Sequence, residues 1–191
     1  MFDQVPWFAA RGAGAVSLLL LSASVSLGLV TVTRFGRDGW PRFLNYELHR
    51  RISLLSVVFL GVHIVAAVAD PFTHLGIAAA LVPLASAYRP VPVALGVVSV
   101  YLFVALIATS LLRKHVGQRA WRAIHWTSYA MWPLALVHGM ASGTDALAPW
   151  MLAVEVGSMA VVAAALAWRL QGRDHLSAAD AARLPRPGLE A

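Results

Sequence analysis

Hydrophobic residues occur in long blocks separated by short polar or Pro-rich connectors, the pattern of a chain that crosses a membrane repeatedly. A helix of roughly 20 predominantly apolar residues spans about 30 Å of hydrocarbon. Five such blocks are predicted, at about residues 13–33, 47–69, 93–112, 121–140 and 149–170. The sequence therefore predicts an all-α integral membrane bundle of about five transmembrane helices.

The stretch from residue 72 to residue 92 is also apolar, but it contains Pro83, Pro90 and Pro92. Proline interrupts a helix because it lacks a backbone N–H and its ring clashes with the preceding turn. A short interfacial helix followed by a loop is expected here, and the bundle has six spans only if this stretch crosses. The flanking segments are predicted as an extracytoplasmic segment, residues 1–12, and a polar, fraying cytoplasmic tail, residues 171–191.

Composition supports the membrane interpretation and narrows the chemistry. Hydrophobic residues make up 59% of the 191 residues and charged residues only 13%, and the mean hydropathy is +0.70, which excludes an ordinary soluble domain. The chain has no cysteine, so thiolate metal sites, iron–sulfur clusters and disulfides are excluded. Any metal chemistry must use histidine.

The basic residues give an orientation. All fifteen Lys and Arg residues except Arg11 and Arg89 lie in the connector after the first span, in the connector before the fourth, or after the fifth. Short loops that stay in the cytoplasm carry this excess, so the N-terminus is predicted outside and the C-terminus in the cytoplasm of the cell (inner) membrane. Orientation and membrane lipid account for the net charge of +6, and no nucleic-acid partner is predicted.

Four of the seven histidines lie in predicted spans, where ionisable residues are costly and usually functional. His49 and His63 are 14 residues apart on the second span, a rise of roughly 21 Å with a phase difference of only about 40°. His125 and His138 are 13 residues apart on the fourth span, a rise of roughly 20 Å. Since both spans run in the same direction, His49 is predicted to lie level with His125, and His63 with His138.

Two stacked histidine pairs match the requirement of electron-transfer haems, which take one axial imidazole on each face. Two b-type haems about 20 Å apart along the bundle axis would carry electrons across most of the hydrocarbon. One detail fits poorly, because 13 residues of an ideal helix leave His138 about 140° out of phase with His125. Pro133 lies between them and is predicted to correct the phase by bending the helix.

Three segments resemble the ferric-reductase-like transmembrane domain, which is shared by NADPH oxidases, metalloreductases and the bacterial membrane partner of periplasmic methionine sulfoxide reductase. They are LHRRISLLSVVFLGVHIV at 48–65, VPLASAYRPVPVALGVVSVYL at 82–102 and WRAIHWTSYAMWPLALVHGMASGTD at 121–145. The family's histidine spacing, with 13 intervening residues on one helix and 12 on the other, is present here. The resemblance identifies residues 13–170 as a haem-binding transmembrane domain.

The resemblance implies an inner haem on His49 and His125 and an outer haem on His63 and His138. Electrons would pass from a reduced cytoplasmic flavin to an extracytoplasmic acceptor. Oxidase and metalloreductase members carry their own FAD and NADPH domain, whereas here residues 171–191 alone follow the last span. A separate flavin protein or other electron donor is therefore expected, while the acceptor and the oligomeric state stay open.

Other residues have two interpretations each. Arg50, Arg51 and Arg122 adjoin the inner histidines and would pair with haem propionates, although orientation and lipid contact explain them equally well. Trp121 and Trp150 are predicted as interfacial anchors. Glu155, a carboxylate within a span, is a functional candidate or a bundle-facing hydrogen bonder. It also defines one alternative function, a small proton or metal-ion transporter with a His/Glu155 relay. The other alternative is a structural anchor for a redox partner.

Overall fold

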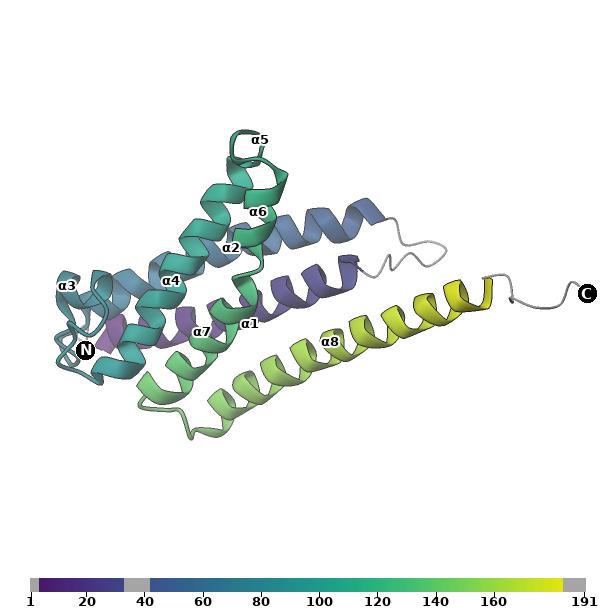
Figure 1. Cartoon of the computed structure of the whole chain (residues 1–191). Helices are drawn as coiled ribbons and strands as arrows, with labels where there is room; N and C mark the ends of the chain where they lie inside the picture. The colour runs from purple at the N-terminus through teal and green to yellow at the C-terminus, as the bar shows by residue number, and fades with distance from the viewer. Residues whose placement is uncertain (1–3, 33–41, 184–191) are drawn as a thin grey trace, which may run out of the picture.

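The computed structural model describes residues 4–32 and 42–183, and all regular structure within them is helical (Figure 1). The elements in chain order are α1 (Val5–Val32), α2 (Arg42–Ala69), α3 (Gly76–Leu81), α4 (Pro90–Leu111), α5 (Arg113–Val116), α6 (Gln118–His125), α7 (Ser128–Ser142) and α8 (Pro149–Arg183). The predicted all-α fold is confirmed.

Within the described residues, four helices are long and apolar enough to cross a membrane, at Val5–Thr31, Phe43–Ala69, Pro90–Leu111 and Pro149–Gln171. The protein is therefore a multi-pass membrane protein. The predicted span at 121–140 is not a single helix, because the chain is divided there into α6 and α7, with a break at Trp126–Thr127. Together α6 and α7 still return the chain from the α5 end of the bundle to the end where α8 begins (Figure 1).

The break between α6 and α7 has a local cause in the hydrogen bonding. The backbone N–H groups of Thr127, Tyr129 and Ala130 bond to the carbonyls three residues earlier, at 2.9, 3.2 and 3.0 Å, which is the pattern of a 3₁₀ turn. The Thr127 hydroxyl also donates to the Ile124 carbonyl at 2.7 Å. A threonine hydroxyl that takes a carbonyl in this way competes with the helical ladder, and the helix is interrupted at this point.

This break, rather than Pro133, is where the helix changes its rotation. A 3₁₀ residue turns about 120° instead of about 100°, so three such residues recover about 60° of the 140° phase deficit. Pro133 lies inside α7, which continues through it to Ser142. The prediction that Pro133 corrects the helical phase therefore placed the correction one to two turns too late in the sequence.

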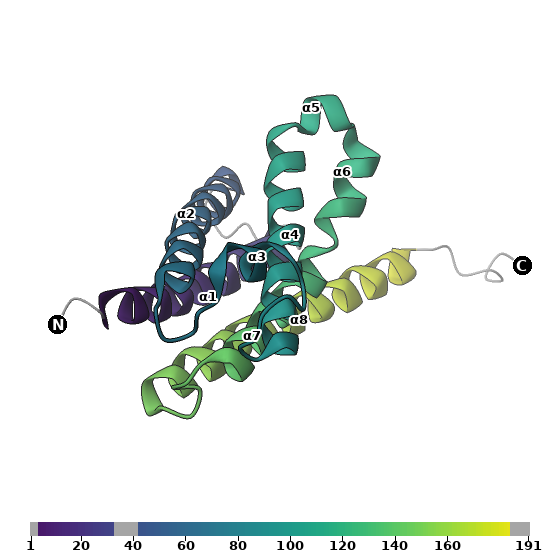
Figure 2. The ribbon, with the colours of Figure 1, turned by 90° about the vertical axis from the view of Figure 1, so that its left-hand side faces the viewer.

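Helix α1 forms the centre of the arrangement. It packs against α2 and α8 along most of its length and more sparsely against α7, while α4 packs against α7. Figure 2 shows α4 and α5 rising beside the α1–α2 pair. A core of Leu21, Phe103, Leu106 and Met131 joins α1, α4 and α7. Since Met131 lies between His125 and His138 in the sequence, this apolar layer separates the two predicted histidine pairs.

Three boundaries differ from or refine the predictions. Residues 72–92 contain the six-residue helix α3 and turns before α4, so the predicted short helix and loop are confirmed, and their interfacial position stays a prediction. Helix α1 begins at Val5, eight residues before the predicted span. The predicted fraying after residue 170 is wrong, because α8 continues to Arg183. Residues 171–183 include four alanines and two arginines, which have high helix propensity.

Candidate functional site

The four histidines predicted from the sequence meet in two pairs. The rings of His49 on α2 and His125 at the end of α6 have centroids 6.2 Å apart and planes at 66°. The rings of His63 on α2 and His138 on α7 also have centroids 6.2 Å apart, with planes at 80°. The two pairs therefore share one spacing although one partner is on α6 and the other on α7.

This spacing is that of two imidazoles on opposite sides of one metal ion. An imidazole nitrogen lies about 2 Å from a metal that it ligates, and about 1.2 Å from the centre of its own ring, whose bonds are about 1.35 Å long. Two imidazoles that held one such metal from opposite sides would consequently have centroids about 6.4 Å apart. Each pair has the separation that a hexacoordinate haem requires.

The donor set fits a haem better than a bare metal ion. Within residues 4–32 and 42–183, no group of three or more His, Cys, Asp or Glu side chains could hold a metal. A haem iron has four equatorial nitrogens from the porphyrin and takes only two axial ligands from protein. Two isolated histidine pairs on facing helices satisfy that need.

Hydrogen bonds fix the tautomer of three of the four rings. The Nδ1 atoms of His49, His63 and His138 lie 2.9, 2.7 and 2.9 Å from backbone carbonyl oxygens of Ser24, Ala10 and Pro92. A carbonyl only accepts, so Nδ1 carries the proton and Nε2 keeps its lone pair. A second partner that holds the ring and leaves Nε2 basic is typical of metal-ligating histidine.

His125 is the exception. Its Nδ1 is buried and has no hydrogen-bond partner among the described residues. Its ring instead stacks on Trp121, with centroids 4.9 Å apart and planes at 28°, and the Arg113 guanidinium lies 4.2 Å from the centre of the Trp121 ring. Trp121, predicted as an interfacial anchor, thus also contacts a site residue.

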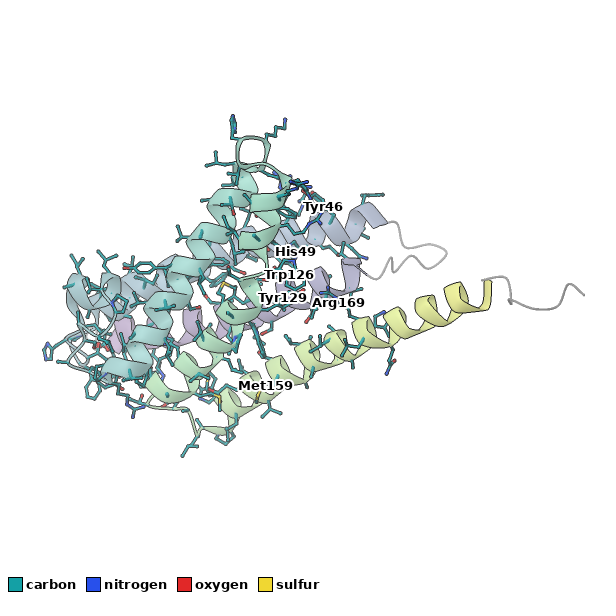
Figure 3. The ribbon with its side chains drawn as sticks, in the orientation of Figure 1. Tyr46, His49, Trp126, Tyr129, Met159 and Arg169 are labelled. Carbon is teal, nitrogen blue, oxygen red and sulfur yellow. The ribbon has the colours of Figure 1, made fainter. Side chains whose placement is uncertain are left out.

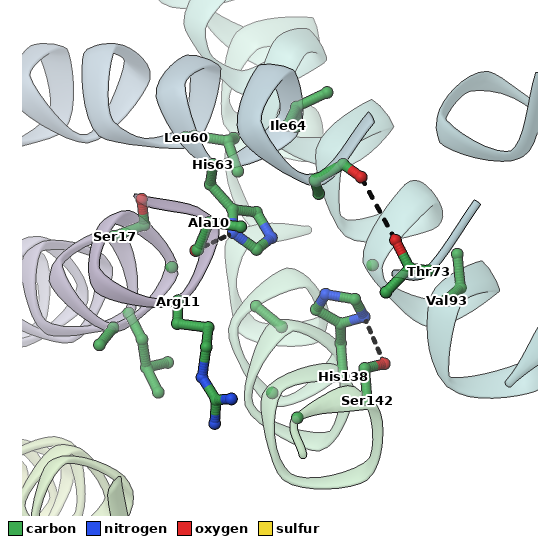
Figure 4. A pocket seen from close by; sticks show the side chains of 18 of the residues that line it. Ala10, Arg11, Ser17, Leu60, His63, Ile64, Thr73, Val93, His138 and Ser142 are labelled. Atoms are coloured by element: carbon green, nitrogen blue, oxygen red, sulfur yellow. Dashed lines mark hydrogen bonds between the residues drawn. The ribbon is translucent and has the colours of Figure 1, made fainter. Parts of the chain in front are cut away.

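A cavity of about 250 Å³ lies at the His63–His138 pair. Figure 4 shows the two rings approaching each other across it from α2 and α7. Arg11 also lines this cavity; its guanidinium forms an ion pair with Asp145 and donates to the Thr144 hydroxyl at 2.6 Å. Trp150 lines the cavity too, so its role extends beyond anchoring.

The predicted arginines lie at the other end, near the His49–His125 pair. Arg50 and Arg51 are exposed, and both form ion pairs with Glu47, which lies one helical turn earlier on α2. Arg51 Nε lies 2.7 Å from Glu47 Oε1. Arg122 is exposed on α6. Their pairing with propionates stays a prediction. At the same end Arg169 of α8 donates to the Tyr129 hydroxyl of α7 at 2.5 Å (Figure 3).

Glu155 is almost completely buried, with 1% of its surface exposed. Helix α8 packs chiefly against α1, and Glu155 Oε1 has no hydrogen-bond partner in the described part of the chain. The predicted bundle-facing position is confirmed, but among the described residues no hydrogen bond links Glu155 to a histidine. His74 and His115 are exposed.

Two kinds of site residue were not predicted from the sequence. They are Arg11, which lines the cavity, and three glycines that contact the histidine rings. A Cβ on Gly14 or Gly96 would lie 2.9 Å from His63 Nδ1 or 2.6 Å from His138 Nδ1. One signal for two of them was visible: Gly14 and Gly28 have the same 14-residue spacing as His49 and His63.

Comparison with known proteins agrees with this geometry. The model of the family described as "Ferric reductase like transmembrane component" matches residues 13–141, a range that includes all four paired histidines and ends before α8. No curated protein and no solved structure matches the chain. The match covers more than half of the sequence, and the chain belongs to the ferric reductase-like transmembrane family.

Proposed function

We propose that the protein is a transmembrane electron-transfer subunit that holds two b-type haems, one on His49 and His125 and one on His63 and His138. The observation that carries the proposal is the 6.2 Å ring spacing found independently in both pairs. When bound, a haem supplies reversible one-electron Fe(III)/Fe(II) chemistry. The role of the chain itself is to bind the haems, to orient them and to insulate them from each other.

The residues around the pairs support these tasks. Nδ1–H bonds to backbone carbonyls hold the rings of His49, His63 and His138 and leave Nε2 available. The core layer of Leu21, Phe103, Leu106 and Met131 provides apolar packing between the two sites. By helix rise the two sites are about 20 Å apart along the axis, which covers most of the hydrocarbon thickness.

The charge distribution supports an orientation in the membrane. Among the described residues, α5, α6 and the first turns of α2 carry basic residues, and His125 and His49 lie on α6 and α2. Short basic loops stay in the cytoplasm, so we place this pair near the cytoplasmic face of the inner membrane, with a separate reduced flavin protein or other donor there. The acceptor then meets the His63–His138 end. Arg50, Arg51 and Arg122 are the proposed propionate partners.

An absorbance spectrum of the purified protein tests the proposal. We expect a Soret band, a reduced α band and two haems per chain, with one haem lost in either His63→Ala or His138→Ala. His74→Ala and His115→Ala are matched controls because both histidines are exposed. A haem-free wild-type protein that moves protons or metal ions in a Glu155-dependent way would instead establish the transporter alternative.

A further inference from the structure

Three of the four histidines form their hydrogen bond to a backbone carbonyl through the same structural arrangement. The carbonyls belong to Ala10, Ser24 and Pro92, and in each case the residue four positions later is a glycine, Gly14, Gly28 and Gly96 respectively. In an α-helix the Cβ of residue i+4 tilts towards the N-terminus and covers the carbonyl of residue i. A glycine at i+4 therefore leaves that carbonyl open to an outside donor.

The contacts at these glycines show how close the rings come. A Cβ at position 96 would lie 2.6 Å from His138 Nδ1, and one at position 14 would lie 2.9 Å from His63 Nδ1. Both distances are shorter than real Cβ contacts, so these two positions admit only glycine while the rings stay in place. At position 28 the nearest His49 atom would be 3.6 Å away, an ordinary contact.

This arrangement occurs twice between α1 and α2, with the same spacing on both helices. His63 follows His49 by 14 residues on α2, and Gly14 precedes Gly28 by 14 residues on α1, so the antiparallel helices present the same arrangement twice.

His125 lacks this support. Its Nδ1 is buried and has no hydrogen-bond partner among the described residues. Its ring instead stacks on Trp121, whose Nε1 donates to Ser110 of α4 at 3.3 Å.

We propose that Gly14, Gly28 and Gly96 are positioning residues that open a carbonyl to His63, His49 and His138, and that His125 lacks this support. The inference rests on the proposed function, because it concerns how axial ligands are held. Its consequence is that the two haem sites are inequivalent: the His63–His138 pair has two fixed imidazoles, and the His49–His125 pair has one. An Nδ1–H bond to a carbonyl makes an imidazole a stronger donor, which favours Fe(III).

The test compares single glycine variants of the full-length, haem-loaded protein by haem-to-protein ratio, EPR of the ferric state and redox titration. A ferric haem with nearly perpendicular imidazole planes gives a strongly anisotropic low-spin EPR signal, so the signal reports ring orientation. We expect Gly96→Ala and Gly14→Ala to remove or shift only the His63–His138 signal. Gly28→Ala should move the His49–His125 signal slightly, since the added Cβ fits.

Gly12→Ala on α1 and Gly61→Ala on α2 are the matched controls, because nothing lies within 4 Å of a Cβ at either position. The retained His49–His125 signal in Gly96→Ala shows that this variant folds. Two unchanged signals in Gly96→Ala would overturn the inference. A wild-type protein without haem would instead defeat the proposed function.

Discussion

The His63–His138 and His49–His125 pairs share a ring separation of 6.2 Å but differ in almost everything around it. The first lines a cavity that Arg11 and Asp145 also line, and both of its Nδ1 atoms bond to carbonyls. The second lies at the basic end, with one Nδ1 bonded to Ser24 and the other unpartnered beneath Trp121.

The distance between the two rings of a pair and the orientation of each ring are set by different structural features. Spacing follows from where α2 stands relative to α6 and α7, and it is the same at both levels. Orientation follows from whether the neighbouring helix offers a carbonyl. A helix carbonyl has a second lone pair free for such a bond, and its use avoids burying a carboxylate in the membrane.

The largest difference between the two pairs is expected when one of the paired histidines is removed. His138→Ala and His125→Ala each leave one axial position empty, so we expect each to lose one haem and to lower transmembrane electron transfer by at least about 100-fold, the upper range seen when only an outer-shell partner is removed. Haem content and EPR should show that each variant keeps the other pair's signal. Loss of both haems in either variant would mean that the two sites do not form independently.

Disruption of the Arg11–Asp145 ion pair should weaken the His63–His138 end only. Arg11→Met leaves the Asp145 side chain, 31% exposed, without its partner, and such a loss costs about 1–3 kcal/mol. Unfolding of the haem-loaded protein in detergent measures this stability. The double variant Arg11→Met with Asp145→Asn should recover part of the loss, and an equal shift in the His49–His125 signal would contradict the assignment.

Removal of the Trp121 ring should affect the other pair. Trp121→Ala abolishes the stack on His125, and aromatic pairs are worth about 0.5–1.5 kcal/mol beyond buried area. We expect a broadened EPR signal for the His49–His125 haem and no change in its counterpart. Trp121→Phe preserves a stacking surface and serves as the control; a result identical to that of Trp121→Ala would assign the effect to the indole N–H bond to Ser110.

The smallest effect is expected at Ser24. Its hydroxyl lies 2.6 Å from the Ser53 hydroxyl and 3.3 Å from His49 Nδ1, but its carbonyl, which holds the ring, survives in Ser24→Ala. Stability should fall by about 0.5–1 kcal/mol with little change in the midpoint potential. Ser17→Ala is the control on the same helix because the Ser17 hydroxyl is unpartnered among the described residues. A large potential shift would show that the hydroxyl, not the carbonyl, supports His49.

Much of this arrangement was predictable. Hydrophobic blocks predicted the membrane fold, and the 14- and 13-residue spacings of His49/His63 and His125/His138 predicted which rings lie together, because helix rise converts sequence separation into depth. The break at Trp126–Thr127 was not predicted, since Thr127 disrupts the helix through its own hydroxyl and threonine is common within spans. Pro133 was the more obvious candidate but lies in a continuous helix.

From the sequence alone followed the membrane class of this protein, the all-helical fold and the pairing of its four histidines, because these depend on hydropathy and helical rise alone. Only the tertiary structure decided which carbonyl each ring meets, that Gly14 and Gly96 are close-approach positions, and that Arg11 reaches Asp145. Those contacts depend on the register and rotation of neighbouring helices, which are set by packing between segments far apart in the chain. The unequal support of the two pairs is a property of that packing.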